Sequence, residues 1–120
     1  MFDHIQIKVK DLKASKRFYT AALAPLGFSI QYEDDGVIGF GPKGAPALWL
    51  GEGESRGPVH IAFVAKDRES VKAFYAAALP AGGKDNGKPG LRPDYAANYY
   101  GGFVKDPDGN NIEAVCHKEE

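Results

Sequence analysis

The sequence has 120 residues, the size of one ordinary domain, and its formal net charge of -1 gives no electrostatic reason to expect a nucleic-acid partner. Hydrophobic residues make up 43% and charged residues 26%, which excludes disorder as the main state. No apolar run approaches the roughly 20 residues that cross a bilayer, and no signal peptide is visible. With a single cysteine, we expect a cytoplasmic protein that binds neither membrane nor nucleic acid.

The first half of the chain predicts a strand, a helix and three short strands. Residues 4–9 alternate polar and apolar, which predicts a strand with His4 and Gln6 on its polar face. A helix is expected to begin after Asp11, a suitable N-cap, and to end before Gly27. Three strands separated by glycine-containing turns follow, at residues 28–32, 37–40 and 47–50.

The second half repeats the first. Residues 60–84 align with residues 4–28 without a gap and are identical at 11 of 25 positions, against roughly two expected by chance. His60 therefore occupies the place of His4 at the start of its unit. We predict an α+β fold in one domain, with module 1 at about residues 1–55 and module 2 at about 56–120.

The two modules differ in length near their ends. Aligning Gly44 with Gly109 places Leu48 against Glu113 and leaves nine extra residues in module 2. We assign the extra residues to 84–98, which is rich in Gly, Pro and Asn and predicts a loop, with a short strand near 82–85 left open. Later strands are expected at 99–104 and 111–117.

Residues 84–98 are a candidate wall of a binding site, because a long loop in a compact domain is often functional. Arg92 and Tyr95 in this stretch could contact a small acidic or phenolic ligand. The alternative is a solvated connection.

Three residues combine position with metal-binding chemistry. By the symmetry of the repeat, His4 and His60 should face each other across a shared sheet surface. Glu113 lies in an otherwise apolar strand, where an unpaired carboxylate would be costly. Two imidazoles and a carboxylate suit a divalent transition metal with open coordination positions. The alternative is that each histidine is only a polar residue at a sheet edge.

The length of the hairpin loop before Glu113 decides which tyrosine lies beside it. A loop of two or four residues places Tyr100 on the face of Glu113, and we take Tyr100 with Glu113 as the candidate catalytic pair. A loop of three residues would present Tyr99 instead. Trp49 neighbours Leu48 and is therefore expected on the opposite sheet face, in core or dimer packing.

The segments DHIQIKV, SKRFY, VHIAFV and DPDGNNIEAV resemble the vicinal oxygen chelate superfamily, which includes glyoxalase I, fosfomycin- and bleomycin-resistance proteins and extradiol dioxygenases. The resemblance covers nearly the whole chain. It implies two βαβββ modules that form an incomplete barrel around a divalent metal ion (Fe, Mn, Ni, Zn or Co). The ligand positions of the superfamily fall on His4, His60 and Glu113.

The chain departs from individual branches of this superfamily. Glyoxalase I has a fourth ligand, a Glu, at the position assigned to Leu48, although Glu52 or Glu54 could replace it. Fosfomycin enzymes have Thr in place of Gln6, and bleomycin-binding members lack the metal ligands. We expect a metal-dependent, homodimeric enzyme of glyoxalase or dioxygenase type that chelates a small substrate through vicinal oxygens, by a dioxygenase-like or a lyase- or isomerase-like reaction. The expected substrate contacts are Gln6, Leu48, Arg92, Tyr95 and Tyr99. The alternative is a sequestration protein without catalysis.

Overall fold

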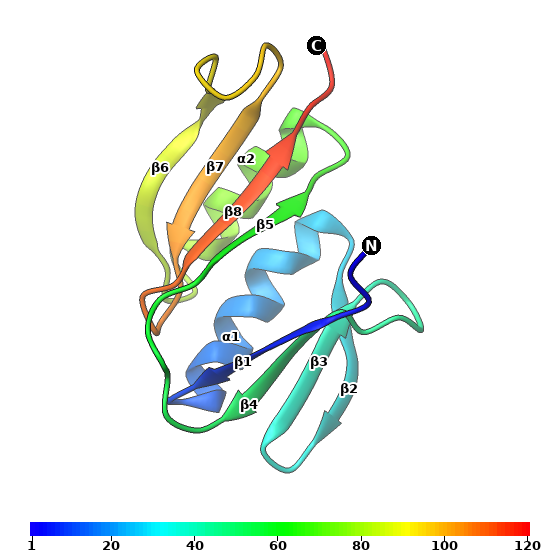
Figure 1. Cartoon of the computed structure of the whole chain (residues 1–120), viewed down its shortest axis with the longest axis vertical. Helices are drawn as coiled ribbons and strands as arrows, with labels where there is room; N and C mark the ends of the chain where they lie inside the picture. The colour runs from blue at the N-terminus through cyan, green and yellow to red at the C-terminus, as the bar shows by residue number, and fades with distance from the viewer.

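The computed structural model describes residues 1–120 and shows two four-stranded sheets, each with one long helix (Figure 1). Module 1 contains β1 (Ile5–Val9), α1 (Leu12–Leu23), the short helix η1 (Ala24–Leu26), β2 (Ser29–Asp34), β3 (Val37–Gly41) and β4 (Leu48–Glu52). Module 2 contains β5 (His60–Val64), α2 (Arg68–Ala78), β6 (Lys84–Leu91), β7 (Tyr100–Lys105) and β8 (Asn111–Cys116). None of the helices has the length and hydrophobicity of a membrane-spanning segment.

The two sheets have the same topology. The strand order is β1-β4-β3-β2 in module 1 and β5-β8-β7-β6 in module 2, and in each sheet the first and last strands of the module are parallel neighbours. The remaining pairs are antiparallel. The predicted pair of βαβββ modules is therefore confirmed. The sheets remain separate and do not close into a barrel.

Both long helices begin where the sequence predicts. The carboxylate of Asp11 accepts a hydrogen bond from the amide of Ala14 at 3.1 Å, and that of Asp67 accepts one from the amide of Ser70 at 2.8 Å. These bonds satisfy amide groups that the first turn of a helix leaves unpaired. The aspartates of the repeat thus fix equivalent helix starts in the two modules.

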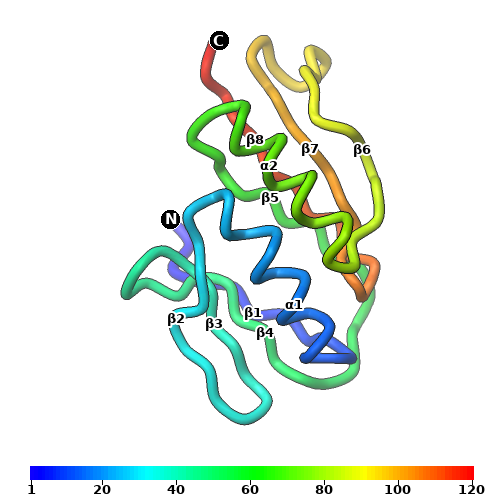
Figure 2. Tube along the Cα trace, turned by 180° about the vertical axis from the view of Figure 1, so that it is seen from behind, coloured from blue at the N-terminus to red at the C-terminus, as the bar shows by residue number.

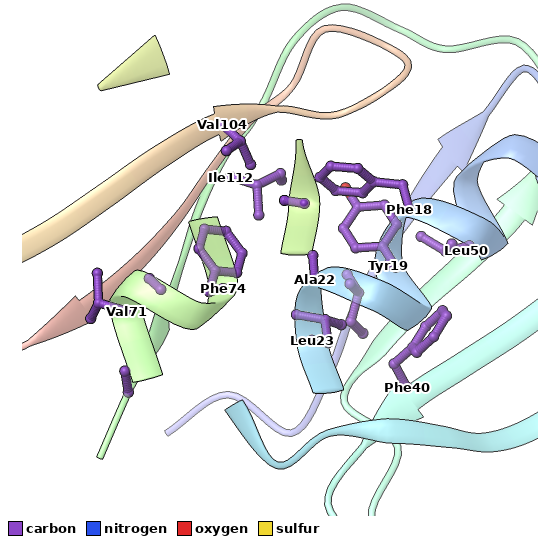
Figure 3. Packing of buried hydrophobic residues seen from close by; sticks show 14 of the residues in the cluster. Phe18, Tyr19, Ala22, Leu23, Phe40, Leu50, Val71, Phe74, Val104 and Ile112 are labelled. Carbon is purple, nitrogen blue, oxygen red and sulfur yellow. The ribbon is translucent and has the colours of Figure 1, made fainter. Parts of the chain in front are cut away.

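The helices cover one side of both sheets. Figure 2, seen from behind, shows α1 and α2 in front of the strands, whereas Figure 1 shows the opposite, open side. The helices also pack against each other, and one core of 17 buried residues spans both modules. Figure 3 shows this core, with Phe18 and Tyr19 of α1 on one side and Phe74 of α2 on the other. No helix covers the other side of either sheet.

The predicted loop at residues 84–98 is wrong in its first half. Residues Lys84–Leu91 form β6, an edge strand whose register to β7 shifts on both sides of Gly87. An edge strand tolerates such irregular pairing and a proline, because one of its sides need not bond to another strand. The turn that follows begins at Arg92, whose amide donates to the carbonyl of Tyr99.

Candidate functional site

Strand register determines which side chains share the face of Glu113. The β7–β8 pairing places Phe103 opposite Glu113, and the bond from the Asp106 amide to the Asn110 carbonyl closes a three-residue loop. Tyr99 therefore lies on the side of Glu113. The prediction that Tyr100 lies there is wrong, because its ring packs on the opposite, helix-covered side, with the Arg68 guanidinium 5.1 Å from its centre.

Glu113 is fully buried, and each of its carboxylate oxygens has a partner. The Nε2 atom of His60 lies 2.8 Å from Oε1, and the hydroxyl of Tyr99 donates to Oε2. The parallel register of β5 and β8, which sets Ala62 opposite Glu113, brings the histidine to this oxygen. These contacts compensate the cost of burying a carboxylate.

The phenol of Tyr99 keeps its proton over a wide pH range and can therefore donate a hydrogen bond. Burial, followed by the hydrogen bond to Glu113 and the charge of that carboxylate, raises the pKa of Tyr99 to about 12. The ring stands edge-on to Tyr95 and to His117, with 5.1 Å between ring centres in each case. Tyr99 is therefore protonated at neutral pH, and its ring is packed against two aromatic neighbours.

The segment after β6 contributes to the surroundings of Glu113. The guanidinium of Arg92 lies 5.2 Å from the centre of the Phe103 ring, and its Nη2 donates to the carbonyl of Lys88 at 2.6 Å. Phe103 also lies 6.3 Å from the ring of His60. Arg92 and Tyr95 thus contact the aromatic neighbours of the His60–Glu113 pair, although neither touches the carboxylate.

A buried hydrogen-bond network connects the start of β5 with the turn before β8, the two strands that carry His60 and Glu113. The sequence did not predict this network. The carboxylate of Asp106 accepts hydrogen bonds from the amide and side chain of Asn110 and, at 2.5 Å, from the hydroxyl of Tyr19 in α1. The side-chain oxygen of Asn110 accepts from the amide of Val59 at 2.8 Å, directly before His60. The DPDGN segment was the available signal, because Asp and Asn commonly bond to the backbone of their own turn.

His4 lies apart from the pair. It is exposed on module 1, with its Nδ1 2.5 Å from a carboxylate oxygen of Asp3. It lines a hollow of about 570 Å³ together with Trp49 and the turn at 42–47. Within one chain, no three His, Cys, Asp or Glu side chains gather into a metal-binding group. The structure therefore does not bring His4 to His60 and Glu113 in a single chain.

The predicted equivalence of Leu48 with Glu113 is wrong by one residue. Gln6 pairs with Trp49, whereas Ala62, the repeat equivalent of Gln6, pairs with Glu113. Trp49 therefore stands in the place of Glu113. Leu48 is 2% exposed and lies in the core on the helix-covered side, and its predicted substrate contact stays a prediction.

The misalignment came from matching two turn glycines. Gly44 and Gly109 both have a left-handed backbone, with φ of 76° and 86°. Both positions need a left-handed backbone, which glycine adopts readily. Relative to the strand that follows, however, the two glycines differ in position by one residue. Glu52 shares the strand face of Leu48, so it does not replace the missing carboxylate on the open side.

The fold and the paired His60–Glu113 site define a class of protein. The chain belongs to the Glyoxalase/Bleomycin resistance protein/Dioxygenase superfamily, whose family model matches residues 1–114. This confirms the resemblance found in the sequence. No curated protein matches the chain.

Solved structures show the same fold. A glyoxalase/bleomycin resistance protein from Albidiferax ferrireducens T118 is 30% identical, with 97% of this chain and 98% of that chain covered and a TM-score of 0.83. The hypothetical protein SA1046 from S. aureus is 26% identical over 94% of each chain, with a TM-score of 0.72. An E126Q mutant of the fosfomycin resistance protein FosX from Listeria monocytogenes, complexed with Mn(II) and 1S,2S-dihydroxypropylphosphonic acid, is 19% identical. It covers 96% of this chain and 88% of that chain, with a TM-score of 0.70.

Proposed function

We propose that the protein is a metal-dependent enzyme that binds a small substrate through two neighbouring oxygen atoms. The observation that carries the proposal is the buried carboxylate of Glu113, with Nε2 of His60 at 2.8 Å from its Oε1. The pair places an imidazole nitrogen and a carboxylate oxygen side by side on the open side of the sheet. Imidazole nitrogens and carboxylate oxygens are common ligands of divalent transition metals.

The donor set fits a first-row transition metal in part. His60 and Glu113 offer one nitrogen and one oxygen on adjacent strands, which suits Fe, Mn, Ni, Zn or Co. When bound, such an ion supplies Lewis-acid stabilisation of charge on the substrate oxygens. The Mn(II) named for FosX supports a divalent ion in this fold. Tyr99 orients the carboxylate by holding Oε2, which leaves Oε1 and His60 as the ligating atoms.

The third ligand in this proposal is His4 of a second copy of the chain. Both sheets expose their open sides in the same direction, because both helices lie behind them (Figures 1 and 2). A twofold dimer can therefore set module 1 of one copy against module 2 of the other and form two equivalent sites. Gln6, on the open side of β1, would line each site, and Arg92 and Tyr95 would contact the substrate from the other module.

A second candidate function is sequestration of a small aromatic compound without catalysis. The aromatic surroundings of Glu113, formed by Tyr95, Tyr99 and Phe103 with Arg92 beside them, could bind such a ligand in the absence of a metal ion. The metal content of the protein separates the two functions.

The test is metal analysis of protein purified without chelator. We expect near-stoichiometric Fe, Mn, Ni, Zn or Co in the parent and a loss of at least tenfold in metal affinity in His60→Ala and Glu113→Ala, because each removes a ligand. His117→Ala is the matched control, since this histidine contacts Tyr99 but not the carboxylate, and it should retain the metal. A metal-free parent that binds no added divalent ion, or full retention in Glu113→Ala, would contradict the proposal.

A further inference from the structure

Trp49 lies flat against its own sheet. A Cβ atom built on Gly39 would lie only 2.9–3.0 Å from three carbons of the indole ring, so the glycine leaves the space that the ring occupies. Gly39 is the direct strand partner of Trp49, and the ring of Tyr32 flanks the indole at 5.4 Å. One face of the indole is therefore applied to the backbone of β3, where only glycine permits such close contact.

The position of Trp49 connects it with the proposed metal site. It occupies the place that is equivalent to Glu113 in the repeat, so module 1 has an indole ring where module 2 has the carboxylate of the proposed metal site. It also lines the hollow of about 570 Å³ that His4 lines. A ligand held near His4 would therefore meet the indole, and not a carboxylate that could serve as a fourth metal ligand.

We propose that Trp49 is a specificity-determining residue that stacks against a flat, conjugated part of the substrate. This inference rests on the proposed function, because the hollow belongs to the same site. An indole fixed flat on a sheet offers its remaining face to a second ring, with the two ring centroids about 4.5–7 Å apart, at little further cost in side-chain freedom. The substrate class is thus a planar aromatic or conjugated compound with two neighbouring oxygens.

Three small compounds separate stacking from chelation. Catechol is flat and has vicinal oxygens, resorcinol is flat but its oxygens are not vicinal, and trans-1,2-cyclohexanediol has vicinal oxygens without a flat ring. Trp49 is the single tryptophan of the chain, so quenching of its fluorescence reports contact directly, and calorimetry gives the affinities. We expect catechol and resorcinol to quench the parent protein and the cyclohexanediol to leave its fluorescence unchanged.

Two variants remove the platform in different ways. Trp49→Leu deletes it, and Gly39→Ala displaces it, because the added methyl group would lie only 2.9–3.0 Å from three carbons of the indole. Each should weaken catechol and resorcinol by at least tenfold and leave the affinity for the cyclohexanediol unchanged. Trp49→Phe should retain most of the affinity, since it keeps a flat ring.

Binding of the aromatic compounds by these variants tests the stacking role of Trp49 separately from the metal-dependent function. No quenching by either aromatic compound, or equal binding of both by the parent, Trp49→Leu and Gly39→Ala, would overturn the stacking role. A dimer that dissociates in Trp49→Leu while Gly39→Ala binds both compounds normally would also overturn it and assign Trp49 to dimer packing. Resorcinol binding that depends on Trp49 in a protein that binds no metal would support stacking and reject the metal-dependent function.

Discussion

At the scale of single residues, the site depends on how a fully buried carboxylate is accommodated. Glu113 has no exposure to solvent, so both of its oxygens need donors or a cation within the protein. Tyr99 holds one oxygen and His60 lies at the other. The sequence was sufficient to select His60 and Glu113, because the repeat and the apolar surroundings of the glutamate single them out.

The sequence could not choose between Tyr99 and Tyr100, because one residue of difference in loop length reverses the face of every side chain in a strand. A difference of one residue also explains why Leu48 was matched with Glu113. Trp49 was for the same reason predicted to lie on the opposite face of the sheet. The alternation of polar and apolar residues specifies which residues of one strand share a face. The pairing partner of each residue depends on the length of the turn, which a glycine in each turn does not reveal.

Tyr99→Phe tests the support of the carboxylate. The variant removes only the hydroxyl and leaves Oε2 of Glu113 buried without its donor, so the free energy of unfolding should fall by about 1–3 kcal/mol. Urea unfolding of the metal-free protein measures the loss. Tyr95→Phe is the control, since the Tyr95 hydroxyl makes no hydrogen bond to another side chain. Equal losses in the two variants would contradict the role of Tyr99.

At the scale of elements, the structure connects module 1 to the site in module 2 through one helix. Tyr19 of α1 is fully buried and donates to Asp106, whose turn precedes β8 and, through Asn110, holds the start of β5. Tyr75, the repeat equivalent of Tyr19, donates instead to the exposed Asp85. The repeat predicted both helices and their caps, but not this difference, because the partner of each tyrosine lies far away in the sequence.

Tyr19→Phe tests this connection and has a defined pH dependence. Burial first, and then the charge of Asp106, raises the pKa of Tyr19 well above its ordinary value of 10.0. The folded state therefore holds the phenol proton more tightly than the unfolded state, so the hydroxyl stabilises fully below pH 10 and less as the pH rises toward the raised pKa.

We expect Tyr19→Phe to lower the free energy of unfolding by about 1–3 kcal/mol at pH 7 and to differ less from the parent above pH 10. Urea unfolding from pH 7 to 11 measures this difference. Tyr75→Phe, which removes an exposed hydrogen bond, should cost less at pH 7. A difference between the parent and Tyr19→Phe that is zero, or that grows above pH 10, would exclude the proposed connection.

At the scale of the whole molecule, the arrangement of the modules explains why the predicted ligands do not meet in one chain. The modules pack through α1 and α2, and the two open sides face the same direction instead of each other (Figure 1). The repeat predicted the modules and their topology, but their relative placement depends on side-chain packing between helices, which periodicity does not specify. The two histidines that symmetry was expected to bring face to face therefore do not meet within one chain.

The most direct test of the proposed metal site between two copies is complementation between two variants that each lack one of its ligands. His4→Ala retains the His60–Glu113 pair, and Glu113→Ala retains His4, so a mixed dimer contains one complete site and one site that lacks both residues. We expect neither variant alone to bind metal tightly. Unfolding and refolding the two variants together should restore about one quarter of the parent metal content, because half of the dimers are then mixed. No restoration in verified mixed dimers would contradict a metal site shared between chains.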